Sequence, residues 1–180
     1  KNGRKFVSNL KNKITFGDYK LADIPKTCVS AIKAVKDLKL NYITIHISSG
    51  LGALKIAKKF AGKTKLIGVT ILTSLNNKSL KEIGFDKDVK RIVLQQAKLA
   101  TKAKLDAIVC SPHEIKIVKK VFKKEIITPG IRLPGDFKGD QKRVMTPKQA
   151  FQNGATALVM GRSLTSNIKK NIQRLVKDLN

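Results

Sequence analysis

Two carboxylates flank one lysine in the segment 18–27, in a chain that has few acids. The sequence of 180 residues holds 38 Lys and Arg but only 12 Asp and Glu, so Asp18 and Asp23 on either side of Lys20 stand out. A neighbouring carboxylate favours the charged form of a lysine, which can then act as a positioned acid. Lys20 is therefore the candidate proton donor, although an ordinary ion pair at a strand end is the alternative.

The position of each acid follows from strand geometry. Asp18 lies two residues before Lys20, so on a strand the two side chains point to the same side. Asp23 falls beyond the predicted end of that strand, from where it can reach the same rim or another subunit. Both acids are candidate catalytic residues together with Lys20.

A second set of residues could hold a phosphate. Gly161 lets backbone N–H groups approach an oxyanion, and Arg162 offers a guanidinium that can bind two phosphate oxygens. This pair alone is a weak signal. Upstream, the Gly- and Asp-containing segment 134–140 has the length and composition of a mobile lid.

Strands that alternate with helices must position these residues. Apolar runs of four to eight residues alternate with longer segments of helical spacing, which predicts an α/β protein. The predicted strands lie near residues 14–20, 42–48, 66–72, 107–111, 126–131 and 157–161. Ser111 and Pro112 are predicted to supply the cap and the first-turn proline of a helix carrying Ile115, Val118 and Phe122.

Repeating β-α units of this length suit either a (β/α) barrel or an open doubly wound sheet. No G-x-G-x-x-G sequence follows the first strand, so a single barrel domain over residues 1–180 is preferred. In a barrel the strand ends form one rim, the face on which active sites are built. His46, in the strand 42–48, either faces this site or is a hydrogen-bonded structural histidine.

The formal net charge of +26 raises the possibility of nucleic-acid binding, because Lys and Arg that neutralise phosphates release counterions. The lysines are spread along the whole chain, however, with no basic block and few aromatic residues for stacking. This distribution favours a solvated cationic surface, which could still attract a small anionic substrate.

The apolar runs are too short to cross a bilayer, so no membrane association is predicted. The two cysteines, Cys28 and Cys110, lie in apolar segments and are interpreted as buried packing residues rather than a disulfide. Both features fit a protein of the reducing cytoplasm.

Five motifs together resemble the orotidine 5′-phosphate decarboxylases of bacteria. They are D-x-K-x-x-D-I-P-x-T at 18–27, L-T-S at 72–74, T-P-G-I-R at 128–132, G-D-Q-x-R-x-M-T-P at 139–147 and V-x-G-R-x-x-T at 159–165. Their order and spacing agree over essentially the whole chain. The resemblance implies a TIM (β/α)8 barrel that converts orotidine 5′-monophosphate to uridine 5′-monophosphate and CO2, without metal or organic cofactor.

The resemblance also implies roles for individual residues. Lys20 would protonate the pyrimidine carbon that loses CO2, Asp18 would lie against the substrate carboxylate, and Asp23 would complete the charge array from the partner subunit of a homodimer. The implied substrate-binding residues are Ile24, Pro25 and Thr27 at the edge of the site, Thr73 near the base, and Arg132, Gln141, Gly161 and Arg162 at the phosphate.

The chain departs from the family pattern at its start, where Lys1 matches the stretch just after the second strand. About six of the eight strands are therefore expected, in an apparently incomplete barrel that is poorly active by itself. Two other functions stay open. Related Mg²⁺-dependent sugar-phosphate decarboxylases and aldolases share the D-x-K-x-x-D element, and a non-catalytic cationic protein could bind nucleic acid.

Overall fold

The computed structural model of the chain describes residues 2–10, 12–136 and 144–180. Its packing divides the chain into two compact units, which are described separately below. The first comprises Lys1–Val69 and Leu99–Ala107, and the second comprises Thr70–Lys98 and Ile108–Asn180. The prediction of a single domain over residues 1–180 stays a prediction.

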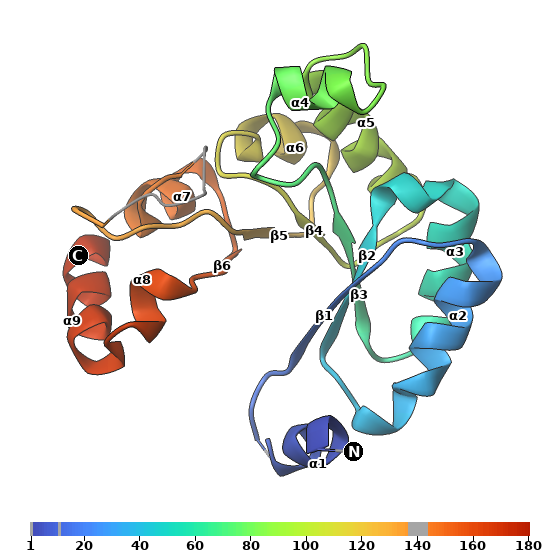
Figure 1. The fold of residues 1–180 in the computed structure, drawn as a ribbon, viewed down its shortest axis with the longest axis horizontal. Coiled ribbons are helices and arrows are strands. Elements are labelled where there is room, and N and C mark those ends of the chain that lie inside the picture. The colour runs from blue at the N-terminus through green and yellow to red at the C-terminus, as the bar shows by residue number, and fades with distance from the viewer. Residues whose placement is uncertain (1, 11, 137–143) are drawn as a thin grey trace. The chain divides into compact units, whose positions relative to one another are not determined.

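Helices and strands alternate along the chain, as the sequence predicted (Figure 1). The strands of the described residues are β1 (Phe16–Leu21), β2 (Tyr42–His46), β3 (Lys65–Val69), β4 (Ala107–Val109), β5 (Glu125–Thr128) and β6 (Ala157–Leu158). They follow one another in the sheet in chain order. The α/β class and the β/α repeat predicted from the sequence are therefore confirmed.

The described residues form the following helices, of which η1 and η2 are short 3-10 segments. They are α1 (Asn2–Asn9), α2 (Pro25–Ala34), η1 (Lys36–Leu38), η2 (Ile47–Ser49), α3 (Gly50–Ala61), α4 (Asn77–Glu82), α5 (Val89–Lys102), α6 (Ile115–Val121), α7 (Pro147–Asn153), α8 (Arg162–Thr165) and α9 (Ile168–Leu179).

Most of the predicted strands extend too far toward the C-terminus. The strand predicted over 42–48 ends at His46, and the strand predicted over 126–131 ends at Thr128. Ile47 and Ile131 follow these ends and are fully buried, although they lie outside the strands. An apolar run marks burial rather than strand hydrogen bonding, so its length overestimates the strand.

The first unit has its core between parallel strands and two helices. β2 pairs with β1 on one side and with β3 on the other, both in parallel. Helices α2 and α3 pack against one another beside these strands (Figure 1). The buried core includes Cys28 and Ile32 of α2, Leu54 of α3, and Ile43 and Ile45 of β2.

The second unit contains the parallel pair β5 and β6, in which Thr128 lies opposite Leu158. The predicted cap at Ser111 and Pro112 is wrong, because α6 begins only at Ile115. The Ser111 carbonyl accepts a bond from the Glu114 N–H at 3.0 Å, so these residues form a separate turn before the helix. A first-turn proline signal cannot distinguish a helix from an isolated turn of the same handedness.

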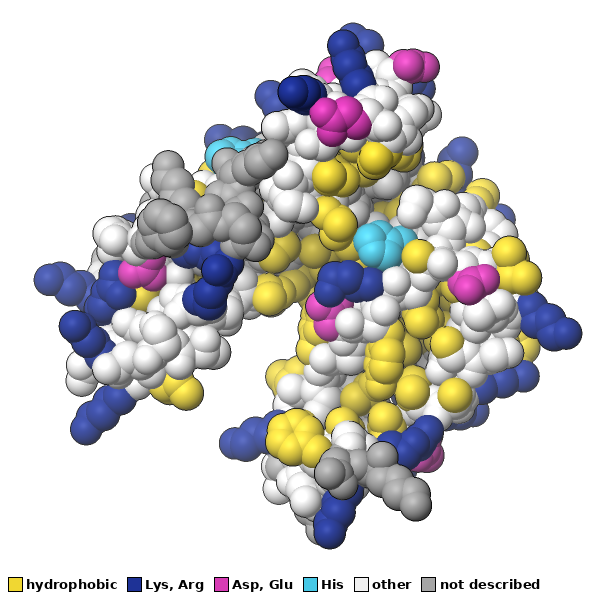
Figure 2. Space-filling view, in the orientation of Figure 1, with side chains coloured by type: hydrophobic (Ala, Val, Ile, Leu, Met, Phe, Trp, Pro, Cys, Tyr) yellow, Lys and Arg dark blue, Asp and Glu magenta, His cyan; other side chains and the backbone are white. Residues whose placement is uncertain are grey.

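Lys and Arg side chains are scattered over the face of the molecule drawn in Figure 2, with few acidic side chains among them. Cys28 and Cys110 are both free and buried, as predicted. Among the residues that the structure describes, no helix combines the length and the apolar character needed to cross a membrane.

Candidate active site

Lys20 lies in an irregular part of β1, which we call the Lys20 bulge and define as residues 18–20. Gly17 pairs with Ile43 of β2, whereas Leu21 pairs with Ile45. Three residues of β1 therefore stand opposite a single residue of β2. The backbone of Lys20 has φ 48°, in the left-handed region that lysine rarely adopts. Such strained residues concentrate at functional sites because the surrounding structure must hold them there.

The predicted pair of Asp18 and Lys20 is present. The Lys20 ammonium forms an ion pair with Asp18 Oδ2, and the two side chains are 46% and 49% exposed. Strict strand alternation does not explain this pairing, because the bulge interrupts it. The left-handed backbone of Lys20 lies within the same bulge as the ion pair.

Thr44 of β2 is the residue opposite the bulge, and sequence reasoning did not select it. Its hydroxyl accepts a hydrogen bond from the Lys20 backbone N–H at 2.8 Å and donates one to Asp18 Oδ1 at 3.0 Å. Its side chain is fully buried. No local pattern in the sequence identifies it, because only the pairing of β1 with β2 reveals its position.

His46 lies two residues after Thr44 on the same strand and shares the surroundings of the ion pair. Burial is the main cause that lowers the pKa of His46, and the Lys20 ammonium lowers this pKa further. The Asp18 carboxylate acts in the opposite direction. Two interpretations of His46 were open. Because both charges act on its pKa, the interpretation that places it beside the candidate site is favoured.

Asp23 and its neighbours form an exposed corner at the start of α2. Asp23 Oδ1 accepts a hydrogen bond from the Ile24 N–H at 2.7 Å. Ile24 occupies the N-cap position, Pro25 is the first helical residue, and Thr27 is exposed in the first turn. Ile24 is 65% exposed, which is unusual for an isoleucine and leaves this corner open for a ligand or another chain.

The other predicted binding residues belong to the second unit. Thr73 lies half-buried in a turn after β3, and Arg132 lies half-buried just after β5. Gly161 and Arg162 are exposed where α8 begins. A Cβ atom added at Gly161 would meet nothing within 4 Å, so its backbone is accessible. Gln141 lies outside the described residues.

Hydrogen bonds and an ion pair fix the chain segments on either side of residues 137–143. Arg132 N–H donates to the Met145 carbonyl at 3.1 Å, and Met145 N–H donates to the Gly130 carbonyl at 3.2 Å. Arg174 of α9 donates to the Pro134 carbonyl at 2.8 Å and forms an ion pair with Asp136 at 2.7 Å. The predicted lid 134–140 lies largely outside the described residues, so its role stays a prediction.

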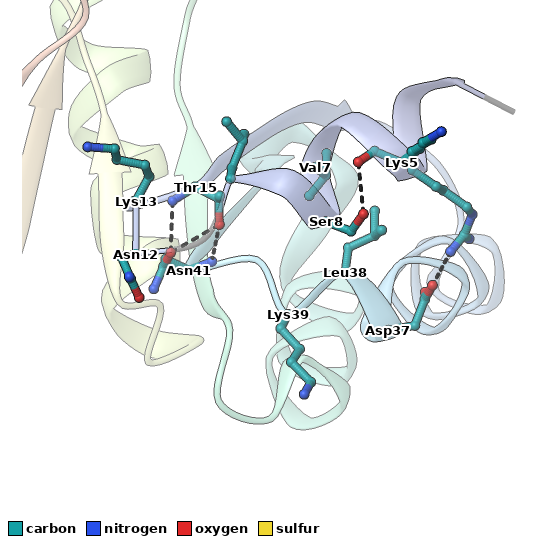
Figure 3. A pocket seen from close by; sticks show the side chains of 12 residues that line it. Lys5, Val7, Ser8, Asn12, Lys13, Thr15, Asp37, Leu38, Lys39 and Asn41 are labelled. Carbon is teal, nitrogen blue, oxygen red and sulfur yellow. Dashed lines mark hydrogen bonds and ion pairs between the residues drawn. The ribbon is translucent and has the colours of Figure 1, made fainter.

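The first unit also contains a pocket of about 880 Å³, whose described lining residues differ from the predicted site residues (Figure 3). Its lining comes from α1, η1 and the residues that precede β1 and β2. Within it, the Thr15 N–H and hydroxyl both donate to Asn41 Oδ1, at 2.8 Å and 3.0 Å. The pocket therefore lies at the amino ends of the strands, whereas Lys20 and His46 lie toward the carboxyl ends.

The described residues contain no group of three or more His, Cys, Asp or Glu side chains that could hold a metal ion.

Parallel strands in chain order, with ionisable side chains toward their carboxyl ends, define the class of β/α-repeat enzymes. The chain belongs to the orotidine 5′-phosphate decarboxylase / HUMPS family, whose profile matches residues 1–171.

Individual relatives agree with this assignment. An orotidine 5′-phosphate decarboxylase of Coxiella burnetii (strain RSA 331 / Henzerling II) is 41% identical, over 98% of this chain and 80% of the relative. The enzyme of that name from Prochlorococcus marinus (strain MIT 9215) is 44% identical, over 89% of this chain and 71% of the relative.

A solved structure supports the same fold. The crystal structure of orotidine 5′-phosphate decarboxylase from Lactobacillus acidophilus superimposes with a TM-score of 0.81 at 30% identity. The match covers 98% of this chain and 79% of that chain. The family resemblance read from the five motifs is thus confirmed, including the barrel type of fold.

Proposed function

We propose that this chain converts orotidine 5′-monophosphate to uridine 5′-monophosphate and CO2, with Lys20 as the proton donor. Family membership and the names of the relatives support the reaction. The observation that carries the role of Lys20 is its ion pair with Asp18 at a left-handed bulge of β1. A lysine paired with a carboxylate in this way has a fixed position from which it can donate a proton.

The reaction needs one bond to break and one proton to move. The bond between the pyrimidine carbon and its carboxylate breaks, CO2 leaves, and the electron pair stays on the ring carbon. The proton of the Lys20 ammonium then passes to that carbon. A fixed ammonium stabilises the developing carbanion more than the neutral ring carbon of the substrate, and this difference accelerates the reaction.

Asp18 has two tasks in this proposal. It forms the ion pair that fixes the Lys20 ammonium, and in the proposed complex it lies against the substrate carboxylate, so repulsion between the two anions is relieved when CO2 leaves. No metal or organic cofactor takes part. Turnover that does not change on addition of EDTA separates this mechanism from the Mg²⁺-dependent sugar-phosphate reactions.

Substrate binding is assigned to the remaining predicted residues. Arg132, Gln141, Gly161 and Arg162 hold the phosphate, and Thr73 contacts the base. Ile24, Pro25 and Thr27 border the ribose. The guanidinium of Arg162 and the accessible backbone of Gly161 are the groups that suit a phosphate dianion.

Lys20→Ala tests the proposal directly. Loss of the general acid should reduce kcat by about 10²- to 10⁴-fold, measured by the change in ultraviolet absorbance as orotidine 5′-monophosphate is consumed. Lys55→Ala, which removes an exposed lysine of α3, is the matched control and should retain the activity of the parent. Equal rates for the two variants would refute the role of Lys20.

We also propose a cytoplasmic homodimer in which Asp23 completes the charge array of the partner subunit. Its exposed position at the start of α2 suits such a role. Mixed dimers of Asp23→Ala and Lys20→Ala subunits test it. Random exchange should restore about a quarter of the sites, because one site of each mixed dimer regains both groups. No recovery in dimers shown to have exchanged would refute the shared site.

A further inference from the structure

The Lys20 bulge is bonded to β2 through a side chain. In a parallel ladder every second N–H of a strand donates to a carbonyl of a given neighbouring strand. Here three residues of β1 face the single residue Thr44, and the Lys20 N–H donates to the Thr44 hydroxyl instead. A side chain of β2 thus holds the bulge where the register shifts.

The same hydroxyl also holds the acid. It donates its only proton to Asp18 Oδ1, while Asp18 Oδ2 faces the Lys20 ammonium. A hydroxyl can donate once and still accept, so Thr44 fixes both ends of the bulge through one oxygen. Because the Thr44 side chain is fully buried, water does not readily substitute for either bond.

We infer that Thr44 is a positioning residue, whose hydroxyl holds the left-handed bulge and thereby places the Lys20 ammonium and the Asp18 carboxylate for reaction. The inference rests on the proposed function for its effect on catalysis. Valine has the shape of threonine but neither donates nor accepts. It would leave the Lys20 N–H and Asp18 Oδ1 without this partner, and the strained backbone could relax.

The kinetic test compares Thr44→Val with Thr44→Ser, which keeps the hydroxyl. We expect kcat to fall about 10- to 100-fold in the valine variant, with KM within about threefold, because a small displacement of a reacting group costs this much. The serine variant should stay within about threefold of the parent. Thr44→Ala provides a second variant without the hydroxyl, for use if the valine variant does not fold.

The second measurement follows His46 by NMR and requires no substrate. The chain has 2 His, so His113→Gln identifies the resonance of His46. In Thr44→Val the side chains of Lys20 and Asp18 should no longer be held beside His46. The pKa of His46 should then rise, because the Lys20 ammonium lowers this pKa more than Asp18 raises it. Thr44→Ser should titrate like the parent.

The two readouts separate the possible failures. A parent that titrates as described but shows no detectable turnover of orotidine 5′-monophosphate contradicts the proposed function, and the His46 titration then decides the role of Thr44. A valine variant with the parental kcat, or with an unchanged pKa of His46, overturns the positioning role. A serine variant as impaired as the valine variant overturns it as well.

Discussion

Glycine at position 20 should lower kcat as much as alanine does and yet give a more stable protein than alanine at the same position. Both substitutions remove the ammonium and its ion pair with Asp18, so this loss cancels in the comparison. They differ in how each tolerates the backbone of Lys20, which has φ 48°. Glycine adopts this conformation without steric cost, whereas alanine does not.

The magnitude follows from the backbone alone. A residue with a Cβ atom pays about 1–2 kcal/mol in the left-handed region. Glycine loses about 0.5–1 kcal/mol more than alanine through the freedom of its unfolded chain. The Lys20→Gly variant should therefore have a free energy of unfolding about 0.5–1 kcal/mol above that of Lys20→Ala. With a urea m value of about 2 kcal/mol/M, its midpoint should lie roughly 0.3–0.5 M higher.

Urea unfolding followed by circular dichroism measures this difference, and two pairs of control variants calibrate it. Lys39 has φ 49° at the end of η1 and should show the same order of stability with activity retained. Lys55 lies within α3, where glycine should be about 1 kcal/mol less stable than alanine. If Lys20→Ala proved at least as stable as Lys20→Gly, the bulge would not be strained as described.

The chain allows three further predictions. Because burial lowers the pKa of His46 in the folded protein, the unfolded chain binds a proton more readily. The free energy of unfolding should therefore fall as the pH drops below about 6.5. Urea titrations at several pH values would measure this fall, and His46→Gln should make it smaller. Arg162→Ala should raise the KM for orotidine 5′-monophosphate by about 10-fold or more, because its guanidinium can bind two phosphate oxygens; an unchanged KM would remove it from the phosphate site. Burial raises the pKa of the Cys28 thiol, so iodoacetamide at pH 8 should label Cys28 only after unfolding, as mass spectrometry of the modified peptides would show.

Most of the architecture could be predicted from local patterns. Each predicted strand overlaps an observed one, because β-branched residues such as those of β2 and β3 recur between helical segments. The pairing of Asp18 with Lys20 was predicted from strand alternation and is present, although the bulge interrupts that alternation. The ends of strands were less predictable, because buried residues such as Ile47 and Ile131 continue the apolar run into turns.

The sequence by itself determined which residues carry charge near β1 and that the chain alternates strands with helices. Tertiary structure decided how the charges are held. The left-handed backbone of Lys20 and the double hydrogen bond of Thr44 both depend on the register between β1 and β2. The register brings together residues that are far apart in the sequence, such as Asp18 and Thr44, which are 26 positions apart. No local propensity encodes such a contact.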